Sequence, residues 1–162
     1  IKRRRRYASS KLQCENMTGL KGEGMQDATA MKQVIQLRAI PVSGMCRDHS
    51  HFLAIREEVV PLMRTYPLQK IWIAGGNTGE KVYSMAILLR EEGLLARTII
   101  YATDINPRSL DKAKQRIFSM ENVRAYTANY QQAGGQRSFA DYYTAAYGYA
   151  IFDKSLCENV TF

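Results

Sequence analysis

The sequence has few residues that bind metals or form crosslinks. Its three cysteines, Cys14, Cys46 and Cys157, are far apart and include no CxxC pair, so neither a disulfide framework nor a zinc site is expected. The two histidines, His49 and His51, form a single HxH pair with no third ligand at suitable spacing. We therefore expect no metal, and no cysteine has an evident base that would make it a nucleophile.

Long hydrophobic runs are also missing. No stretch of about 18 or more apolar residues occurs, which excludes a membrane-spanning helix. No apolar segment follows the basic first residues, so we expect no secretory signal and predict a cytoplasmic protein. With 46% hydrophobic and 23% charged residues in 162 positions, the composition is that of one globular domain, or one domain with an appendage.

The net charge of +8 is unevenly distributed. Residues 1–70 carry 13 Lys and Arg against 6 Asp and Glu, whereas residues 71–162 carry 10 against 9. The run Lys2–Arg6 either attracts an acidic partner such as nucleic acid or forms a solvated chain end or helix face. We favour the second interpretation and expect no nucleic-acid partner, because no aromatic residues are interleaved with the basic ones.

Helices are expected before the first strand. Residues 1–45 are predicted to form a helical segment with a turn at residues 17–24, and Pro41 ends its second helix. A further helix is predicted from His51 to Tyr66, and Pro61 should break or kink it.

The middle of the chain has the pattern of a strand, a turn, a helix and a second strand. The apolar runs 71–74 and 98–103 predict buried strands, with Trp72 in the core. A Gly-rich turn and a helix over residues 80–92, which Gly93 is expected to end, separate them. Because two apolar strands joined by a helix are normally parallel, this unit predicts a partial Rossmann-like core over residues 46–120.

The last part of the chain is predicted to be a small antiparallel β subdomain over residues 121–162. A helix with Asn106 as its N-cap and Pro107 in its first position precedes it, with Ile117 on the inner face of that helix. The fold class is therefore α/β. The predicted antiparallel strands are 138–145, 149–153 and 159–162.

The turn after the first strand has the chemistry of an adenosine-binding loop. Such a turn lets a ligand approach the backbone, and Asp104 at the end of the next strand can hold ribose hydroxyls. The turn has neither a GxGxxG nor a GxxxxGK pattern, and Glu80 stands where a pyrophosphate would bind. Like charges about 4 Å apart repel by about 4 kcal/mol, which favours the cationic S-adenosyl-L-methionine over a phosphate ligand. The alternative is that Glu80 only complements the helix dipole and Asp104 only caps the next turn.

Residues 74–84 read AGGNTGEKVYS, and residues 102–105 read ATDI. This resembles the CheR-type chemotaxis receptor methyltransferases, whose pattern is AGCSTGEExYS followed by ATDI. An upstream family element, NxTxFFR followed by an acidic residue, is matched by Ser43, Arg47 and Asp48. The resemblance is specific from about residue 30 to about residue 120 and looser beyond.

The resemblance implies how S-adenosyl-L-methionine is bound. Glu80 contacts its amino group, Asp104 contacts its ribose, and Gly75 and Gly79 shape the turn. The same resemblance implies that Ser43 is a weaker contact of the cofactor.

Arg47 is the implied catalytic residue. It lies near the methyl-transfer centre and pairs with the cofactor carboxylate or with the acceptor glutamate; without the resemblance, it reads as a surface residue paired with Asp48. Four departures concern the site: Lys81 replaces the family's second Glu, Pro41 replaces its Asn, and the family's Cys and Ser in the turn are replaced by Gly76 and Asn77. Lys81 places a positive charge beside a site for a cationic ligand.

The resemblance implies methylation of glutamate side chains on a chemotaxis-type receptor, with S-adenosyl-L-homocysteine as the product. The chain ends at Phe162, before the family's NL and CRNVxIYF elements, so it resembles a truncated or degenerate member. The alternative is therefore a non-catalytic remnant that binds cofactor or a receptor peptide. In some members, the subdomain that corresponds to the tyrosine-rich tail docks the receptor's C-terminal peptide by adding a strand, and an ordinary packing face is the other interpretation.

Overall fold

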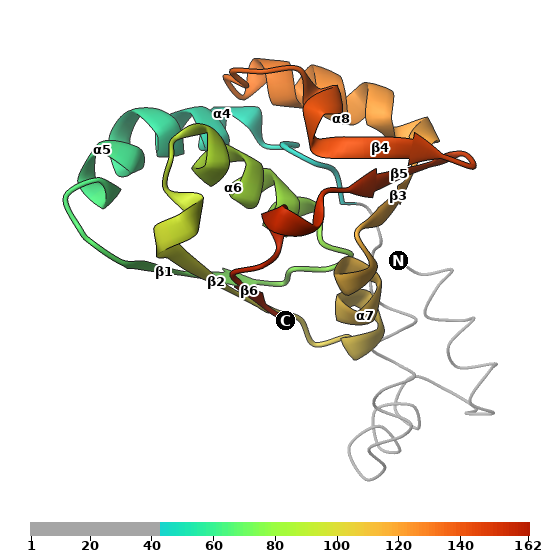
Figure 1. Ribbon diagram of the computed structural model, residues 1–162, viewed down its shortest axis with the longest axis horizontal. Coiled ribbons are helices and arrows are strands. Elements are labelled where there is room, and N and C mark those ends of the chain that lie inside the picture. Colours follow the sequence, from blue (N-terminus) through green and yellow to red (C-terminus); the bar gives the residue numbers. More distant parts are fainter. Residues whose placement is uncertain (1–42) are drawn as a thin grey trace, which may run out of the picture. The chain divides into compact units, whose positions relative to one another are not determined.

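Figure 1 shows the computed structural model of the chain, which describes residues 43–162. Almost all of the helical segment expected over residues 1–45, and the basic run Lys2–Arg6, lie outside the described residues. Within them, helices alternate with strands of one parallel and one antiparallel sheet. This arrangement confirms the predicted α/β class.

The parallel sheet contains three strands in the order β1-β2-β6, namely β1 (Gln69–Ala74), β2 (Thr98–Thr103) and β6 (Val160–Thr161). β1 and β2 pair in parallel over their whole length, which confirms the predicted unit. The antiparallel strand expected at residues 159–162 is wrong, because β6 pairs in parallel with β2 through Ile100 and Val160. A short 3-10 turn at Lys154–Leu156 precedes β6. The direction in which the chain continues after this turn makes the pairing of β6 with β2 parallel.

Helix α6 (Glu80–Glu91) connects β1 to β2 and forms the centre of the fold. Figure 1 shows it above the parallel sheet, with helices α4 and α8 on its far side. The helix ends with a left-handed Gly93 at φ +69°, as predicted, and the Leu94 N–H donates to the Leu89 carbonyl at 2.7 Å. Glycine favours this ending because it has no Cβ to clash in the left-handed conformation.

The helix expected from His51 to Tyr66 consists of three parts. These are α4 (His49–Ala54), a π-helical turn (Ile55–Val59) and α5 (Val60–Met63). Pro61 lies in the first turn of α5, where a missing N–H is tolerated, and the wider π turn comes directly before it. The proline therefore coincides with a change of helix type.

The antiparallel sheet has the order β3-β5-β4 and includes β3 (Ile117–Ser119), β4 (Tyr143–Ala146) and β5 (Tyr149–Phe152). Tyr147 and Gly148 join β4 to β5 with φ values of +50° and +78°, the signs of a type I′ hairpin turn. Ile117 lies in β3 and is partly exposed, so its expected place on a helix face is wrong. The preceding helix α7 (Pro107–Gln115) ends at Arg116, whose backbone is left-handed. The helix has therefore ended before Ile117.

The prediction named no helix in the region of α8 (Met120–Gln132), which lies between β3 and β4. Ser119 caps it by accepting a hydrogen bond from the Glu121 N–H at 3.3 Å. The N-cap of α7 is Asn106, whose side chain accepts from the Arg108 N–H, as expected. These caps fix where α7 begins after β2 of the parallel sheet and where α8 begins after β3 of the antiparallel sheet.

One apolar core joins the two sheets through α6. Tyr83 of α6 is fully buried, and its ring lies 5.6 Å from Phe118 of β3 and 5.8 Å from Phe152 of β5, measured between ring centroids. Ile87 and Leu88 of the same helix are also buried. None of the helices in residues 43–162 has the length and hydropathy of a membrane span.

Candidate functional site

The Gly-rich turn after β1 is attached to the end of β2. The N–H groups of Gly75 and Gly76 both donate to the Thr103 carbonyl, at 2.8 and 2.9 Å. At Gly79, φ is +101° and a Cβ would lie only 3.0 Å from the Cβ of Ala113. At Gly75, φ is +72°, but a Cβ would meet no other atom within 4 Å. Both backbones therefore favour glycine, and close packing adds to that requirement at Gly79 alone.

The carboxylate of Asp104 fixes this turn. Its Oδ2 accepts a hydrogen bond from the Asn77 N–H at 2.9 Å, and its Oδ1 accepts one from the Asn106 N–H at 2.8 Å. Asp104 thus caps the next turn, as the alternative interpretation stated, and also holds the Gly-rich turn in place. Each oxygen keeps a lone pair for a further donor, so contact with a ribose hydroxyl stays a prediction.

Glu80 is a buried carboxylate at the first position of α6. It is 6% exposed, and its Oε2 accepts a hydrogen bond from the Thr78 hydroxyl at 2.7 Å. Burial and the negative charge of Glu80 raise the pKa of Tyr126, from α8, to about 12. No Lys, Arg or His among the described residues forms an ion pair with Glu80. Within the described part of the chain, this buried carboxylate is therefore stabilised by the neutral Thr78 hydroxyl and by the positive end of the helix dipole.

A pocket of about 690 Å³ lies beside the turn, between α4, α6 and the edge of β1 that has no neighbouring strand among the described residues. Its charged residues are Arg47, Asp48 and Lys81. The predicted site residues in its wall are Ser43, Arg47 and Gly75.

The other three predicted residues are beside the pocket and do not line it. Asp104 bonds to Asn77, which lines the pocket, and Glu80 precedes Lys81, which does so too. Gly79 is buried at the start of α6. The turn thus brings the predicted residues into one region, but their contacts with a ligand stay predictions.

Trp72 was missed as a pocket residue, and its predicted place in the core is wrong. It is 72% exposed and lines the pocket, and its Nε1 donates to the Thr103 hydroxyl at 2.9 Å. Trp72 lies on the same face of β1 as the exposed Lys70 and Ala74, and its partner on β2, Tyr101, is also exposed. The apolar run showed a strand, but it could not show which face of that strand is covered.

The segment before α4 carries Ser43 and Arg47 into the pocket wall. The Cys46 N–H donates to the Ser84 hydroxyl of α6 at 2.9 Å, and Asn129 of α8 donates its side-chain N–H to the Met45 carbonyl at 3.1 Å. Burial raises the pKa of Cys46 to about 11, so its thiol keeps its proton at neutral pH. The segment is therefore fixed from two helices, and Cys46 is unsuited to act as a nucleophile.

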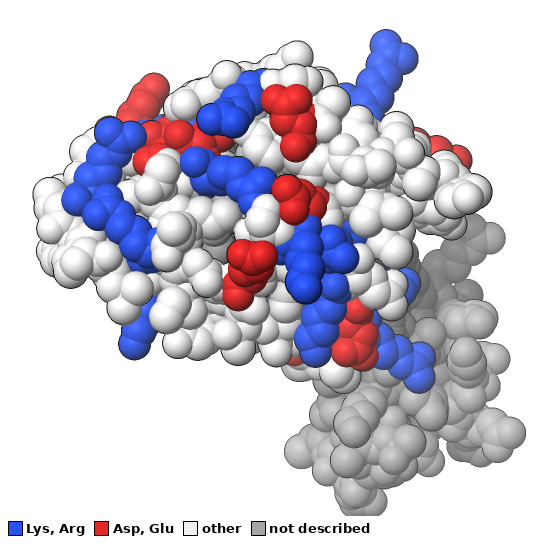
Figure 2. Space-filling view, in the orientation of Figure 1, with Lys and Arg blue, Asp and Glu red and all other residues white. Residues whose placement is uncertain are grey.

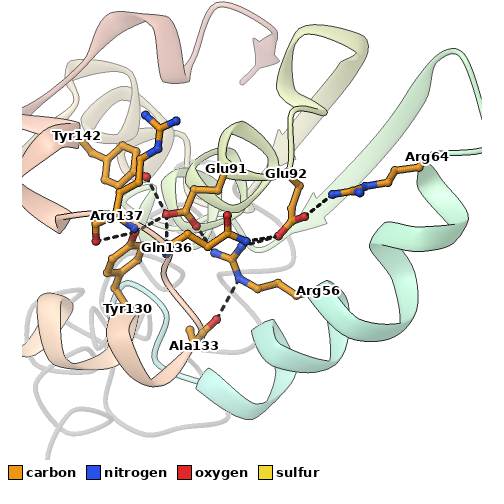
Figure 3. A network of polar contacts seen from close by, with 9 residues as sticks. All are labelled: Arg56, Arg64, Glu91, Glu92, Tyr130, Ala133, Gln136, Arg137 and Tyr142. Carbon is orange, nitrogen blue, oxygen red and sulfur yellow. Dashed lines mark hydrogen bonds and ion pairs between the residues drawn. The ribbon is translucent and has the colours of Figure 1, made fainter.

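A polar network, drawn in Figure 3, holds the far end of α6. The fully buried side chain of Glu91 accepts hydrogen bonds from the Tyr130 and Tyr142 hydroxyls, from the Gln136 N–H and from Arg56. Burial alone would raise the pKa of Glu91, but these donors outweigh it and hold the pKa below its usual value. The network therefore favours a charged Glu91.

Arg56 extends this network to the helix that borders the pocket. From the π-helical turn, it also donates to Glu92 at 2.8 Å and to the Ala133 carbonyl at 3.1 Å. Arg64 reaches the second oxygen of Glu92 at 2.8 Å. The α4–α5 helix is thereby held against α6 and the end of α8.

The fold and the site define a class of protein, an α/β domain with a Gly-rich turn and acidic residues suited to an adenosyl ligand. A family model described as CheR methyltransferase, SAM binding domain, matches residues 42–162. The chain belongs to this family, and S-adenosyl-L-methionine is the cofactor of the domain. The family resemblance expected from the Gly-rich turn is confirmed.

Relatives in three bacteria agree with this assignment. The chain is 60% identical over 162 residues to "Putative methyltransferase Cher3" of Pseudomonas putida. The match covers 100% of the chain and 59% of that protein. It is 29% identical over 90 residues to a chemotaxis protein methyltransferase of Listeria innocua, covering 54% of the chain and 34% of the relative. It is 26% identical over 104 residues to a chemotaxis protein methyltransferase of Salmonella typhimurium. That match covers 63% of the chain and 35% of the relative. The chain thus spans less than two thirds of each of these relatives.

Proposed function

We propose that this chain binds S-adenosyl-L-methionine for the transfer of a methyl group to glutamate side chains of a chemotaxis-type receptor. One observation carries the proposal: the carboxylate of Glu80 is buried beside the Gly-rich turn, where the Thr78 hydroxyl donates to it and no cationic side chain of residues 43–162 pairs with it. A buried anion is stabilised when a cation or several hydrogen bonds neutralise it. The ammonium group of the cofactor supplies such a cation, whereas a phosphate would be repelled.

The remaining residues of the site fit the rest of the cofactor. Asp104 has lone pairs left for ribose hydroxyls, and the open space beside Gly75 leaves the backbone accessible to a ligand. Ser43 supplies a further hydroxyl in the pocket wall. When bound, S-adenosyl-L-methionine supplies a methyl group that is already activated.

Arg47 is the residue that we assign to the acceptor. It is exposed in the pocket wall, and a guanidinium group can bind a carboxylate through two hydrogen bonds. A glutamate side chain is ionised at pH 7, so no protein base has to remove a proton from it. The task of the protein is then to align the acceptor carboxylate, which Arg47 does from the fixed segment before α4.

Calorimetry on the whole chain tests the cofactor assignment. We expect Glu80→Gln to weaken the binding of S-adenosyl-L-homocysteine by about 10- to 100-fold, because a hydrogen bond to a charged group is lost. The matched control is Glu58→Gln, which changes an exposed carboxylate of the π-helical turn and should leave binding unchanged. Equal binding by the wild-type chain and Glu80→Gln would contradict the assignment.

Lys81 favours a second candidate function, a non-catalytic module that binds a receptor peptide. Its positive charge in the pocket wall opposes a cationic ligand. We expect Lys81→Glu to tighten S-adenosyl-L-methionine binding about threefold, with the exposed Lys112→Glu of α7 as the control. The wild-type chain could bind a receptor tail peptide but neither S-adenosyl-L-methionine nor S-adenosyl-L-homocysteine. In that case the non-catalytic function replaces the proposed methyl transfer.

The antiparallel sheet is the surface that we propose for the receptor's cytoplasmic domain or its C-terminal peptide. β4 is at one edge of this sheet, and Ile117, Tyr149 and Ile151 are partly exposed on it. A peptide can add a strand to such an edge and place its side chains on the exposed face. We accordingly propose a cytoplasmic site of action.

Nucleic acid is not a proposed partner. Residues 43–162 carry 14 Lys and Arg against 12 Asp and Glu, and Figure 2 shows the two signs interspersed on the face that it draws. Most of the excess positive charge therefore belongs to residues 1–42, outside the described part of the chain. The described residues on the face drawn in Figure 2 thus form no purely positive patch of the kind that binds a phosphate backbone.

A further inference from the structure

Thr78 lies in the Gly-rich turn between two residues whose backbones are fixed. On one side of it, the Asn77 N–H donates to Oδ2 of Asp104 at 2.9 Å, and on the other side the Gly79 N–H donates to the Gly76 carbonyl at 3.0 Å. Both neighbours have a left-handed backbone, with φ values of +49° at Asn77 and +101° at Gly79. The turn therefore presents the partly buried side chain of Thr78 from a restrained backbone.

The hydroxyl of Thr78 donates to a carboxylate. Its Oγ1 lies 2.7 Å from Oε2 of Glu80, and because an ionised carboxylate can only accept, the hydroxyl is the donor. A threonine beside the start of a helix commonly caps a backbone N–H, but the N-cap of α6 is Gly79, which has no side chain for that task. Thr78 thus holds one oxygen of Glu80 and leaves the lone pairs of Oε1 for another donor.

We infer that Thr78 is a positioning residue, which holds Oε2 of Glu80 so that Oε1 is presented to the amino group of the cofactor. The inference rests on the proposed function, because it takes Glu80 as the ligand of that amino group. A carboxylate with one oxygen already hydrogen-bonded has less rotational freedom than a free one. It therefore loses less conformational entropy when the ligand binds.

A comparison of two ligands separates positioning from a merely structural role. S-adenosyl-L-homocysteine has the amino acid moiety, whereas methylthioadenosine has the nucleoside and thioether without it. Thr78→Val keeps the branched shape of the side chain and removes the hydroxyl. We expect it to weaken S-adenosyl-L-homocysteine binding about fivefold, as measured by calorimetry on the whole chain, and to leave methylthioadenosine binding unchanged.

Two further variants show whether the hydroxyl itself is responsible. Thr78→Ser keeps the hydroxyl and should retain the wild-type affinity for both ligands. The matched control is Thr65→Val, which removes an exposed hydroxyl that also makes a 2.7 Å hydrogen bond, to the Leu62 carbonyl at the end of α5, and should change neither affinity. If Thr78→Val fails to fold, as judged by circular dichroism, Thr78→Ala replaces it with the same expected ligand selectivity.

Each result has a distinct meaning. A selective loss of S-adenosyl-L-homocysteine affinity in Thr78→Val, together with full affinity in Thr78→Ser, supports the inference. An equal loss for both ligands, no loss for either, or a loss that Thr78→Ser or Thr65→Val shares overturns it while the proposed function stands. If the wild-type chain binds neither S-adenosyl-L-homocysteine nor S-adenosyl-L-methionine, the proposed function fails, and the role of Thr78 fails with it.

Discussion

At the scale of single residues, the site depends on one acidic side chain, Glu80, which starts α6. The Thr78 hydroxyl, from the turn before the helix, donates a hydrogen bond to its carboxylate. This hydrogen bond brings no positive charge, and no cationic side chain of the described residues pairs with Glu80. The negative charge of Glu80 is therefore available to a cationic ligand.

The glycines of the turn give a prediction at the same scale. We expect Gly79→Ala to lower the free energy of unfolding by about 2 kcal/mol or more, because it combines a left-handed backbone with a close contact to Ala113. Gly75→Ala is the matched variant and should cost only about 1 kcal/mol, since it adds a left-handed alanine in open space. Chemical denaturation measures both, and equal losses would show that the packing at Gly79 adds nothing.

At the scale of elements, helix α4 is held in place by contacts at both of its ends. The preceding segment bonds to α6 and α8 through Cys46 and Met45, and the following π-helical turn bonds to Glu91 and Glu92 through Arg56. Arg47 and His51, which line the pocket, lie between these two anchors. The position of the pocket wall therefore depends on helix contacts well outside it.

Glu91 is the residue of this network whose loss should be most costly. We expect Glu91→Gln to lower the free energy of unfolding by about 3 kcal/mol, because Arg56 would keep its buried position and lose a charged partner. Urea denaturation measures the loss, with the exposed Glu57→Gln as the control. A change below about 0.5 kcal/mol would show that the network does not stabilise the helix contacts.

The pH dependence of stability follows from the same carboxylate. Because the pKa of Glu91 is lower in the folded chain than in the unfolded chain, its contribution is present above the unfolded pKa and is lost as the pH falls through the folded pKa. We therefore expect the free energy of unfolding to fall less steeply in Glu91→Gln than in the wild type between about pH 5 and pH 3. Parallel curves for the two proteins would contradict this.

At the scale of the whole molecule, one helix joins the two sheets. α6 begins at the proposed cofactor site, crosses the aromatic core shared by both sheets, and ends in the Glu91 network. α8 contacts the antiparallel sheet through Tyr126 and the segment before α4 through Asn129. The surface proposed for the receptor is thus connected through α8 to the segment that forms part of the pocket wall.

The parts of this arrangement that the sequence predicted are local. The strands 71–74 and 98–103, the helix between them and the glycine stop at Gly93 follow from apolar runs and turn residues within a short stretch. The parallel pairing of β6 could not be predicted in this way, because a strand of two residues carries almost no pattern of its own. Its direction is decided by its contact with β2, which is distant in the sequence.

The same distinction applies to the site. Glu80 and Asp104 stand directly after a turn and a strand, so their spacing identified them as candidates. Trp72 could not be identified, because its exposure depends on which face of the parallel sheet is covered. The tyrosine-rich composition of the tail was visible, but it did not show that Tyr126 is buried whereas Tyr149 is exposed.

A structure of the chain with S-adenosyl-L-homocysteine bound is the most direct measurement of the central claim. The account predicts that the ligand's amino nitrogen lies within hydrogen-bonding distance of the Glu80 carboxylate, with the ribose at Asp104. A ligand bound elsewhere, or one whose amino group contacts neither oxygen of Glu80, would contradict it.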